Sequence, residues 1–134
     1  EGSQDFYLIS YADVLLMRAE AMAETGDVAG ATGSVNQMRA RVGMPSVESV
    51  EGTVNHEQMI EIVRHDRRVE IALEGLRFMD LKRWGTVEEG FQRAISDPVG
   101  PYNPQYLGGR SEVFPIPQAE IDVNPNLTQN PVWM

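Results

Sequence analysis

The stretch "DRRVEIALEGLRFMDLKRWG", residues 66–85, decides how this chain folds, because it combines helical spacing with an unusual density of charge. It holds four acidic and five basic side chains, whereas the rest of the chain holds 16 acidic and six basic ones. Apolar residues such as Val69, Ile71 and Phe78 are interleaved with these charges. A helix that is both this charged and this apolar needs either ion pairs inside a core or a functional cluster of carboxylates.

The first part of this stretch belongs to a helix that is predicted to run from His56 to about Glu74. Asn55 is a good N-cap, and Gln58 at the third helical position can complete a capping box. Gly75 breaks the helix, and a short helix from Leu76 to Trp84 is predicted to follow. The segment 55–85 is therefore read as one helix plus a short one.

Three carboxylates of the long helix, those of Asp66, Glu70 and Glu74, fall on its apolar arc at i, i+4 spacing. Such a column repels itself unless cations meet it. The expected structural ion network consists of Asp66, Arg67, Glu70, Glu74, Arg77, Asp80 and Arg83, with Arg39 and Arg41 as further partners. A catalytic pair of the glycosidase kind is the alternative. Abundant arginine opposes the raised pKa that a general acid needs, so the pattern favours the structural interpretation.

Residues 7–43 are predicted to form a helical hairpin. On the first helix an inward face is expected to contain Leu8, Ala12, Leu15, Ala19, Met22 and Ala23, opposite Asp13, Glu20 and Glu24. Gly26 suits the turn and Asp27 the cap of a second helix that ends near Val42. On this second helix Val28, Ala31, Val35 and Met38 are expected to face inward. The spacing fits a tetratricopeptide-type unit, which needs neighbours to bury both of its faces.

The remaining segments are predicted to be irregular. Residues 46–54 are read as a loop, and residues 90–134 as a loop and an extended strap, because six of the eight prolines lie from Pro101 onward. One turn is expected near residues 118–121. Phe114 and Ile116 are expected to insert between helices and Trp133 to pin the end. The fold class predicted from all this is all-α, with tetratricopeptide-like hairpins and a proline-rich C-terminal strap.

Composition excludes several classes of function. A chain of 134 residues with a net charge of −9 suits one domain that does not bind nucleic acid. There is no cysteine, and the two histidines lack a third ligand, so neither a metal nor a cofactor site is predicted. No apolar run is long enough to span a bilayer. The chain begins at Glu1 without a signal peptide, and we expect it to be a processed or truncated piece of something longer.

A ligand site is predicted on the loop before the strap. Sugars bind to aromatic faces with planar polar partners, and the residues of this kind on the glycine-flanked loop are Tyr102, Asn103, Tyr106 and Arg110. The alternative is an ordinary surface loop.

Four segments in this order resemble a known family: "YADVLLMRAEAMAETG", "MRARVGMP", "DRRVEIALEGLRFMDLKRWG" and "VFPIPQAEIDVNPNLTQNPVW". Together they resemble the C-terminal part of SusD-like (RagB/SusD) nutrient-binding proteins, over most of the chain from Tyr11 to Trp133. The family usually has Glu where Asp66 stands, Ala at Val42 and Gly-Tyr at residues 132–133. The resemblance implies that residues 1–134 form a single SusD-like C-terminal domain.

The resemblance also implies a function. It points to a surface lipoprotein of the outer membrane in Bacteroidetes-type bacteria, whose lipid anchor and signal peptide are absent from this chain. Such a protein captures oligosaccharides or other nutrients without enzymatic action and delivers them to a SusC-like, TonB-dependent transporter. One rival is a tetratricopeptide-type scaffold that binds a peptide in a concave groove. The other is a carbohydrate-active enzyme, which requires two acids in a cleft with no arginine against them.

Overall fold

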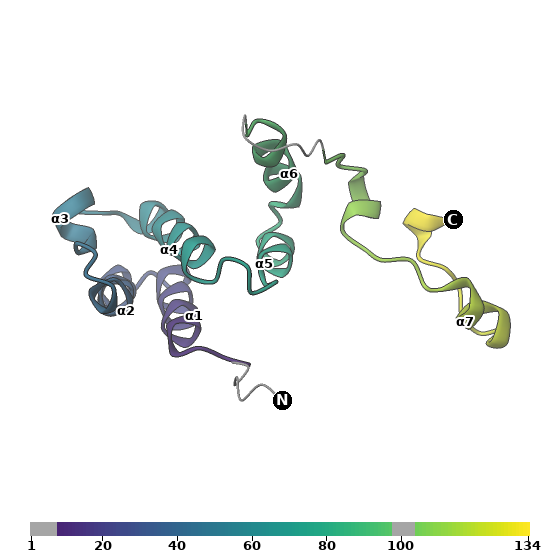
Figure 1. Ribbon diagram of the computed structural model, residues 1–134, viewed down its shortest axis with the longest axis horizontal. Coiled ribbons are helices and arrows are strands. Elements are labelled where there is room, and N and C mark those ends of the chain that lie inside the picture. Colours follow the sequence, from purple (N-terminus) through teal and green to yellow (C-terminus); the bar gives the residue numbers. More distant parts are fainter. Residues whose placement is uncertain (1–7, 98–103) are drawn as a thin grey trace, which may run out of the picture. The chain divides into compact units, whose positions relative to one another are not determined.

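The computed structural model describes residues 8–97 and 104–134, and within these ranges it contains helices and no strand. The prediction of an all-α fold is confirmed. The chain divides into two compact units, Glu1–Gly75 and Leu76–Met134 (Figure 1). Among the described helices, none combines the length and the apolar character needed to cross a membrane. That residues 1–134 act as a single domain stays a prediction.

The first unit begins with the expected helical hairpin, formed by α1 (Tyr11–Glu24) and α2 (Val28–Arg41). Ser10 caps α1 by accepting a hydrogen bond from the backbone N–H of Asp13. Asp27 caps α2 in the same way, because its carboxylate accepts from the N–H of Gly30 at 2.9 Å. Gly26 in the turn has φ +85, a conformation that glycine adopts without steric cost. The hairpin is confirmed, and its tetratricopeptide-type assignment stays a prediction.

The core of this unit lies where the hairpin meets the later helices. Its larger cluster consists of Ala19, Ala23, Ala31, Val35, Val47, Met59 and Val63. A smaller cluster consists of Leu15, Leu16 and Met38. Alanines at these positions let the helices approach closely. Three expectations for α1 are wrong: Leu8 precedes the helix and is exposed, and Asp13 and Glu20 are largely buried rather than facing solvent.

Residues 46–54 contain a short helix, α3 (Val47–Glu51), where a loop was predicted. Ser46 caps it, and the backbone N–H of Val47 donates to the side-chain oxygen of Asn36 on α2 at 2.8 Å. The Val47 side chain is completely buried in the core. A single buried anchor therefore holds a helix that is too short to show a periodic apolar pattern.

Helix α4 (His56–Glu70) begins as predicted, with a capping box between Asn55 and Gln58. It ends four residues earlier than expected, because the chain turns at Leu73, which has φ +70 and a fully exposed side chain. Gly75, with φ +79, completes the turn.

The second unit begins with α5 (Arg77–Arg83), close to its predicted bounds, and α6 (Val87–Ile95), which was not predicted. A methyl group on Gly90 of α6 would lie only 2.6 Å from a methyl carbon of Leu81, so the missing side chain permits close packing of these two helices. The helix α6 replaces the first part of the loop expected over residues 90–134.

The C-terminal segment is largely irregular, with η1 (Gly108–Ser111), α7 (Gln118–Val123) and η2 (Pro131–Trp133) as its only regular pieces in the described residues. The turn expected near residues 118–121 is confirmed as α7. Gln129 links two parts of the C-terminal segment. Its side-chain oxygen accepts from the N–H of Ile116, and its side-chain nitrogen donates to the carbonyl of Ile116, both at 2.9 Å. Trp133 donates from Nε1 to the carbonyl of Val113. The insertion expected for Phe114 is wrong, because its side chain is 76% exposed.

Candidate functional site

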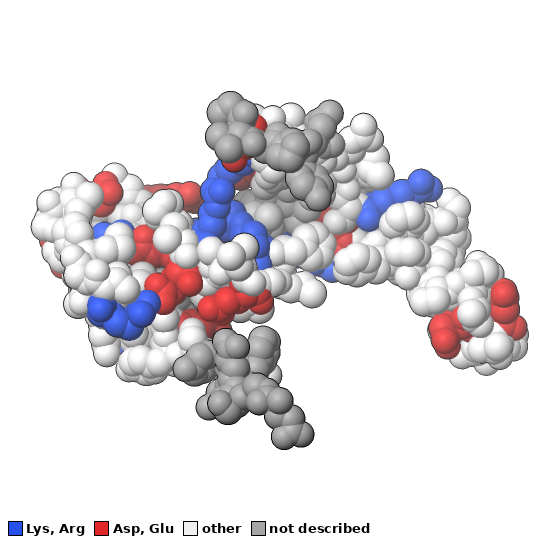
Figure 2. Space-filling model, in the orientation of Figure 1, with Lys and Arg blue, Asp and Glu red and all other residues white. Residues whose placement is uncertain are grey.

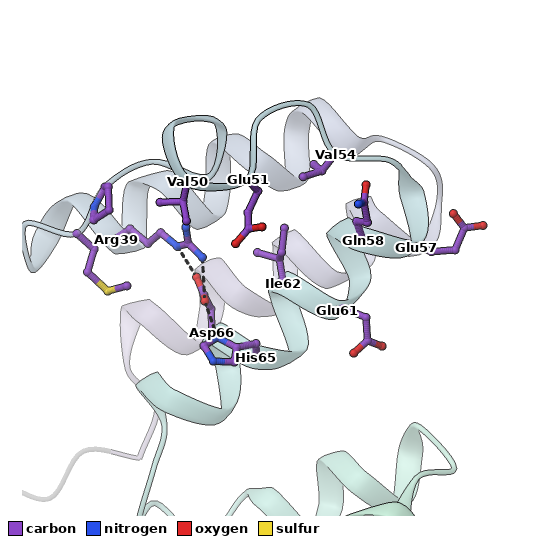
Figure 3. A pocket seen from close by; sticks show the side chains of 12 residues that line it. Arg39, Val50, Glu51, Val54, Glu57, Gln58, Glu61, Ile62, His65 and Asp66 are labelled. Carbon is purple, nitrogen blue, oxygen red and sulfur yellow. Dashed lines mark hydrogen bonds and ion pairs between the residues drawn. The ribbon is translucent and has the colours of Figure 1, made fainter.

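A groove of about 790 Å³ opens in the first unit between α2, α3 and α4 (Figure 3). Its apolar wall consists of Met44, Pro45, Val50, Val54 and Ile62. Its polar lining consists of Arg39, Glu51, Glu57, Gln58, Glu61, His65 and Asp66. The short helix α3 supplies one side of the groove, and the capping box at Asn55 fixes where α4 begins on the other side.

Arg39 and Asp66 form the floor of this groove. Nε of Arg39 donates to Oδ2 of Asp66 at 2.7 Å, and Nη2 donates to Oδ1 at 3.1 Å. The two side chains are 8% and 4% exposed. The hydrogen bond to Asp66 raises the pKa of Arg39; burial opposes this, and the charges of Asp66 and Glu51 reinforce it. The floor is therefore a bidentate pair in which each charge compensates the other.

Of the further ion pairs that connect the helices of this unit, two differ in burial. Arg41 on α2 donates to Glu70 on α4, and these side chains are 58% and 20% exposed. Arg67 donates to Asp13 on α1, with both side chains mostly buried. Because the second pair is buried and the first is not, the two contribute unequally to stability.

The structure places the expected ion network as follows. Asp66, Arg67 and Glu70 each meet a partner from α1 or α2, and Asp66 also lies 3.2 Å from Nδ1 of His65 on its own helix. In the second unit Asp80 is buried and bonds Arg83 at 3.0 Å. The expectation that Glu74 is buried is wrong, because α4 ends before it and its side chain is exposed.

Arg77 has a contact that spacing alone did not predict. Its guanidinium lies 5.6 Å from the ring centre of Trp84, and that of Arg83 lies 4.8 Å from the same ring. Cation–π contacts of this kind stabilise the position of an aromatic ring.

Of the four residues predicted to bind ligand, the structure describes Tyr106 and Arg110, both in the second unit. Tyr102 and Asn103 fall outside the described residues. Tyr106 donates from its hydroxyl to Glu112 at 2.6 Å, and its ring centre lies 5.7 Å from that of Phe91. This hydrogen bond raises the pKa of Tyr106 to about 12, with smaller effects from desolvation and neighbouring carboxylates.

Arg110, the fourth predicted ligand residue, also has internal partners. It donates from Nε to the carbonyl of Val132 at 2.6 Å and lies 5.2 Å from the ring centre of Trp133. Among the described residues no cluster of three or more potential metal ligands is present.

Acidic side chains gather over the first unit on the face shown in Figure 2. Four of the chain's acidic residues line the groove: Glu51, Glu57, Glu61 and Asp66. Sequence reasoning missed the groove because residues 46–54 were read as a loop. Local sequence signals for α3 do exist. Ser46, directly after Pro45, is an N-cap residue, and Gly52 can adopt the left-handed conformation that ends a helix.

Comparisons with known proteins agree with this architecture. The model of the SusD family matches residues 1–133. SusD-like protein P2 of Formosa agariphila is 32% identical over 136 residues, and SusD-like protein P38 of the same organism is 31% identical over 128 residues. The alignments cover 97% and 92% of this chain but 26% and 24% of the relatives. The chain thus spans about a quarter of the length of the relatives it matches.

Solved structures give the same result. A SusD superfamily protein from Bacteroides vulgatus has a TM-score of 0.72 with 34% identity, over 93% of this chain and 27% of its own. A SusD homologue from Bacteroides thetaiotaomicron has a TM-score of 0.75 with 34% identity, over 94% of this chain and 26% of its own. Similarity in sequence and in fold therefore extends along nearly all of the 134 residues, and the chain belongs to the SusD family.

Proposed function

We propose that this chain is part of a longer, non-enzymatic receptor that captures an oligosaccharide or another nutrient, and that it supplies the receptor with a helical scaffold. Membership of the SusD family is the observation that carries this proposal. Its match to about a quarter of each relative supports a part rather than the whole of such a receptor.

The aromatic rings support a scaffold role. Sugar recognition uses aromatic faces that are free to stack. In the second unit Phe91 and Tyr106 pack on each other, and so do Phe78 and Phe114. Trp84 and Trp133 carry arginine guanidinium groups over their rings. These contacts occupy part of the aromatic surface that a sugar would need, although Phe114 remains 76% exposed. We therefore expect the chief stacking platform elsewhere in the receptor.

The arginine-paired carboxylates of α4 support capture without bond cleavage. A glycosidase needs one carboxyl group that gives a proton and a second that acts as base or nucleophile. Here Asp66 accepts two hydrogen bonds from Arg39, and Glu70 accepts one from Arg41. These carboxylate oxygens are engaged by arginine side chains and do not form a free pair of the kind a glycosidase uses. The groove floor is therefore a structural pair in this proposal.

We also infer, from the family, an outer-membrane surface location and delivery of the nutrient to a TonB-dependent, SusC-like transporter. The test of this partner is co-purification. The complete gene product, carrying an affinity tag, is isolated in mild detergent from its own bacterium. An outer-membrane transporter should be retained with it in stoichiometric amount, and recovery of the receptor alone would contradict delivery to such a partner.

The nutrient is tested with a glycan array that is probed with the complete gene product. Each bound oligosaccharide is then incubated with the protein and analysed by mass spectrometry. We expect binding of at least one class of glycan, recovered intact. Shortened products would show that the protein is a carbohydrate-active enzyme instead.

A further inference from the structure

The groove between α2, α3 and α4 has no role in the scaffold function proposed above. Its apolar wall is accessible to solvent, since Val50 is 56% and Met44 is 47% exposed. Apolar side chains that line a concave surface together, rather than being scattered singly, indicate a contact site. A ligand of this groove would have to match both its apolar wall and its charge.

The charge of the groove comes from three exposed carboxylates. Asp66 on the floor is neutralised by Arg39. Glu51 on α3 and Glu57 and Glu61 on α4 remain, and we call these three the acidic rim. Figure 3 shows Glu51 pointing toward the floor pair, with Glu57 and Glu61 along the edge of α4.

The rim keeps its charge available to a partner. Glu61 is 70% exposed, and its ion pair with Arg64 is long at 3.8 Å. Exposed pairs of this kind contribute little, so an approaching cation competes with it easily. A groove with an apolar wall and an acidic rim is complementary to a chain that presents apolar and basic side chains next to each other.

We propose that this groove docks a segment of a partner protein in which a bulky aliphatic residue is flanked by lysine or arginine. The aliphatic side chain lies against Val50, Val54 and Ile62, and the flanking cations reach the acidic rim. Lysine and arginine are suited to this, because their aliphatic stems cover apolar surface while their charged ends stay at the carboxylates.

Other occupants fit the groove less well. A neutral sugar lacks a stacking surface there, since the lining contains no Phe, Tyr or Trp. Nucleic acid is repelled by the acidic rim. A metal ion is not favoured either, because within residues 8–97 and 104–134 no cluster of three potential ligands is found. A peptide segment can contact the apolar wall and the acidic rim at the same time. The proposal does not depend on which nutrient the receptor captures.

The test is a nuclear magnetic resonance titration of the 134-residue chain, labelled with ¹⁵N. The probe is the peptide acetyl-Gly-Lys-Leu-Lys-Gly-amide, and the control peptides carry Glu in place of both Lys, or Gly in place of Leu. We expect the probe to shift amide signals of residues 44–66, and each control peptide to bind at least about five-fold more weakly. The affinity for the probe should fall as salt is added.

Variants of the chain locate the site. The double variant Glu57→Gln/Glu61→Gln removes two rim charges and should weaken probe binding about five-fold. The matched control Glu88→Gln/Glu89→Gln makes the same change on α6, where both residues are exposed, and should bind the probe like wild type. A dispersed spectrum shows that each variant is folded. The proposal is overturned if the probe causes no shifts, if shifts spread equally to the acids of α6 and α7, or if the rim variant binds like wild type.

Discussion

Arg39 and Asp66 are 27 positions apart in the chain, and their side chains form a two-pronged ion pair that is almost completely buried between α2 and α4. The pair joins the hairpin to the third long helix and at the same time forms the floor of the groove. Burying two charges is costly unless each satisfies the other. The geometry, with contacts of 2.7 and 3.1 Å, meets that condition.

The first prediction concerns this pair. Replacement Asp66→Ala leaves the Arg39 guanidinium buried without its partner, and we expect the free energy of unfolding to fall by roughly 3–5 kcal/mol. Glu70→Ala removes the more exposed pair with Arg41 and should lower the free energy of unfolding by about 1 kcal/mol or less. Urea unfolding followed by circular dichroism measures both changes.

A double replacement separates pairing from packing. Arg39→Met/Asp66→Leu removes both charges and fills the space with apolar side chains, and such changes are often neutral or stabilising. We expect the double variant to be clearly more stable than Asp66→Ala. Wild-type stability for Asp66→Ala would refute the structural role of the pair.

The second prediction concerns the turn after α4. Leu73 has φ +70 with a fully exposed side chain, so it bears the steric cost of a left-handed conformation with no gain from burial. We expect Leu73→Gly to raise the free energy of unfolding by about 1 kcal/mol. Ala72→Gly next to it makes a change of similar kind and should be destabilising, because glycine adds freedom to the unfolded chain. A loss of stability in Leu73→Gly would show that the turn is not strained.

The third prediction concerns Tyr106. Its pKa is raised from 10.0 to about 12, chiefly because its hydroxyl donates to Glu112. A group whose pKa is higher in the folded state contributes stability below its unfolded pKa. This contribution is therefore present below pH 10 and is lost as the pH rises through about 12.

Ultraviolet absorbance of tyrosinate measures this titration. The difference between wild type and Tyr106→Phe isolates Tyr106, and Glu112→Gln should move that transition toward lower pH. The replacement Tyr11→Phe is the control and should leave the high-pH ionisation of Tyr106 unchanged. A Tyr106 that titrates identically with and without Glu112 would contradict the hydrogen bond.

Local signals in the sequence predicted much of the fold. The caps at Asp27 and Asn55 and the left-handed turn at Gly26 act through backbone groups close to them in the chain, so they can be read directly. The all-α class followed from these caps and from apolar spacing. Apolar spacing could not reveal the helix α3, because a single buried residue, Val47, anchors it through a contact with another helix. Its local signals are the cap at Ser46 and the left-handed Gly52.

The ion pairs show a second limit. Helical spacing predicts that acids on α4 need cations, and Arg39 and Arg41, which were among the expected partners, pair with Asp66 and Glu70. The same spacing suggested pairs within the stretch, yet Arg67 meets Asp13 on α1. It also assumed a continuous helix to Glu74, whereas the chain turns at Leu73. Periodicity assigns a face to each residue but does not say where a helix ends or which neighbour meets that face.

The central claim is that these 134 residues form a scaffold within a nutrient receptor, and calorimetric titration tests it most directly. The chain and the complete gene product are each titrated with an oligosaccharide that the complete product binds on the array. The claim predicts measurable binding by the complete product and, for the chain alone, binding no tighter than millimolar. Micromolar binding by the chain, abolished in a Tyr102→Ala/Tyr106→Ala variant, would contradict it and would place the binding site within this part of the receptor.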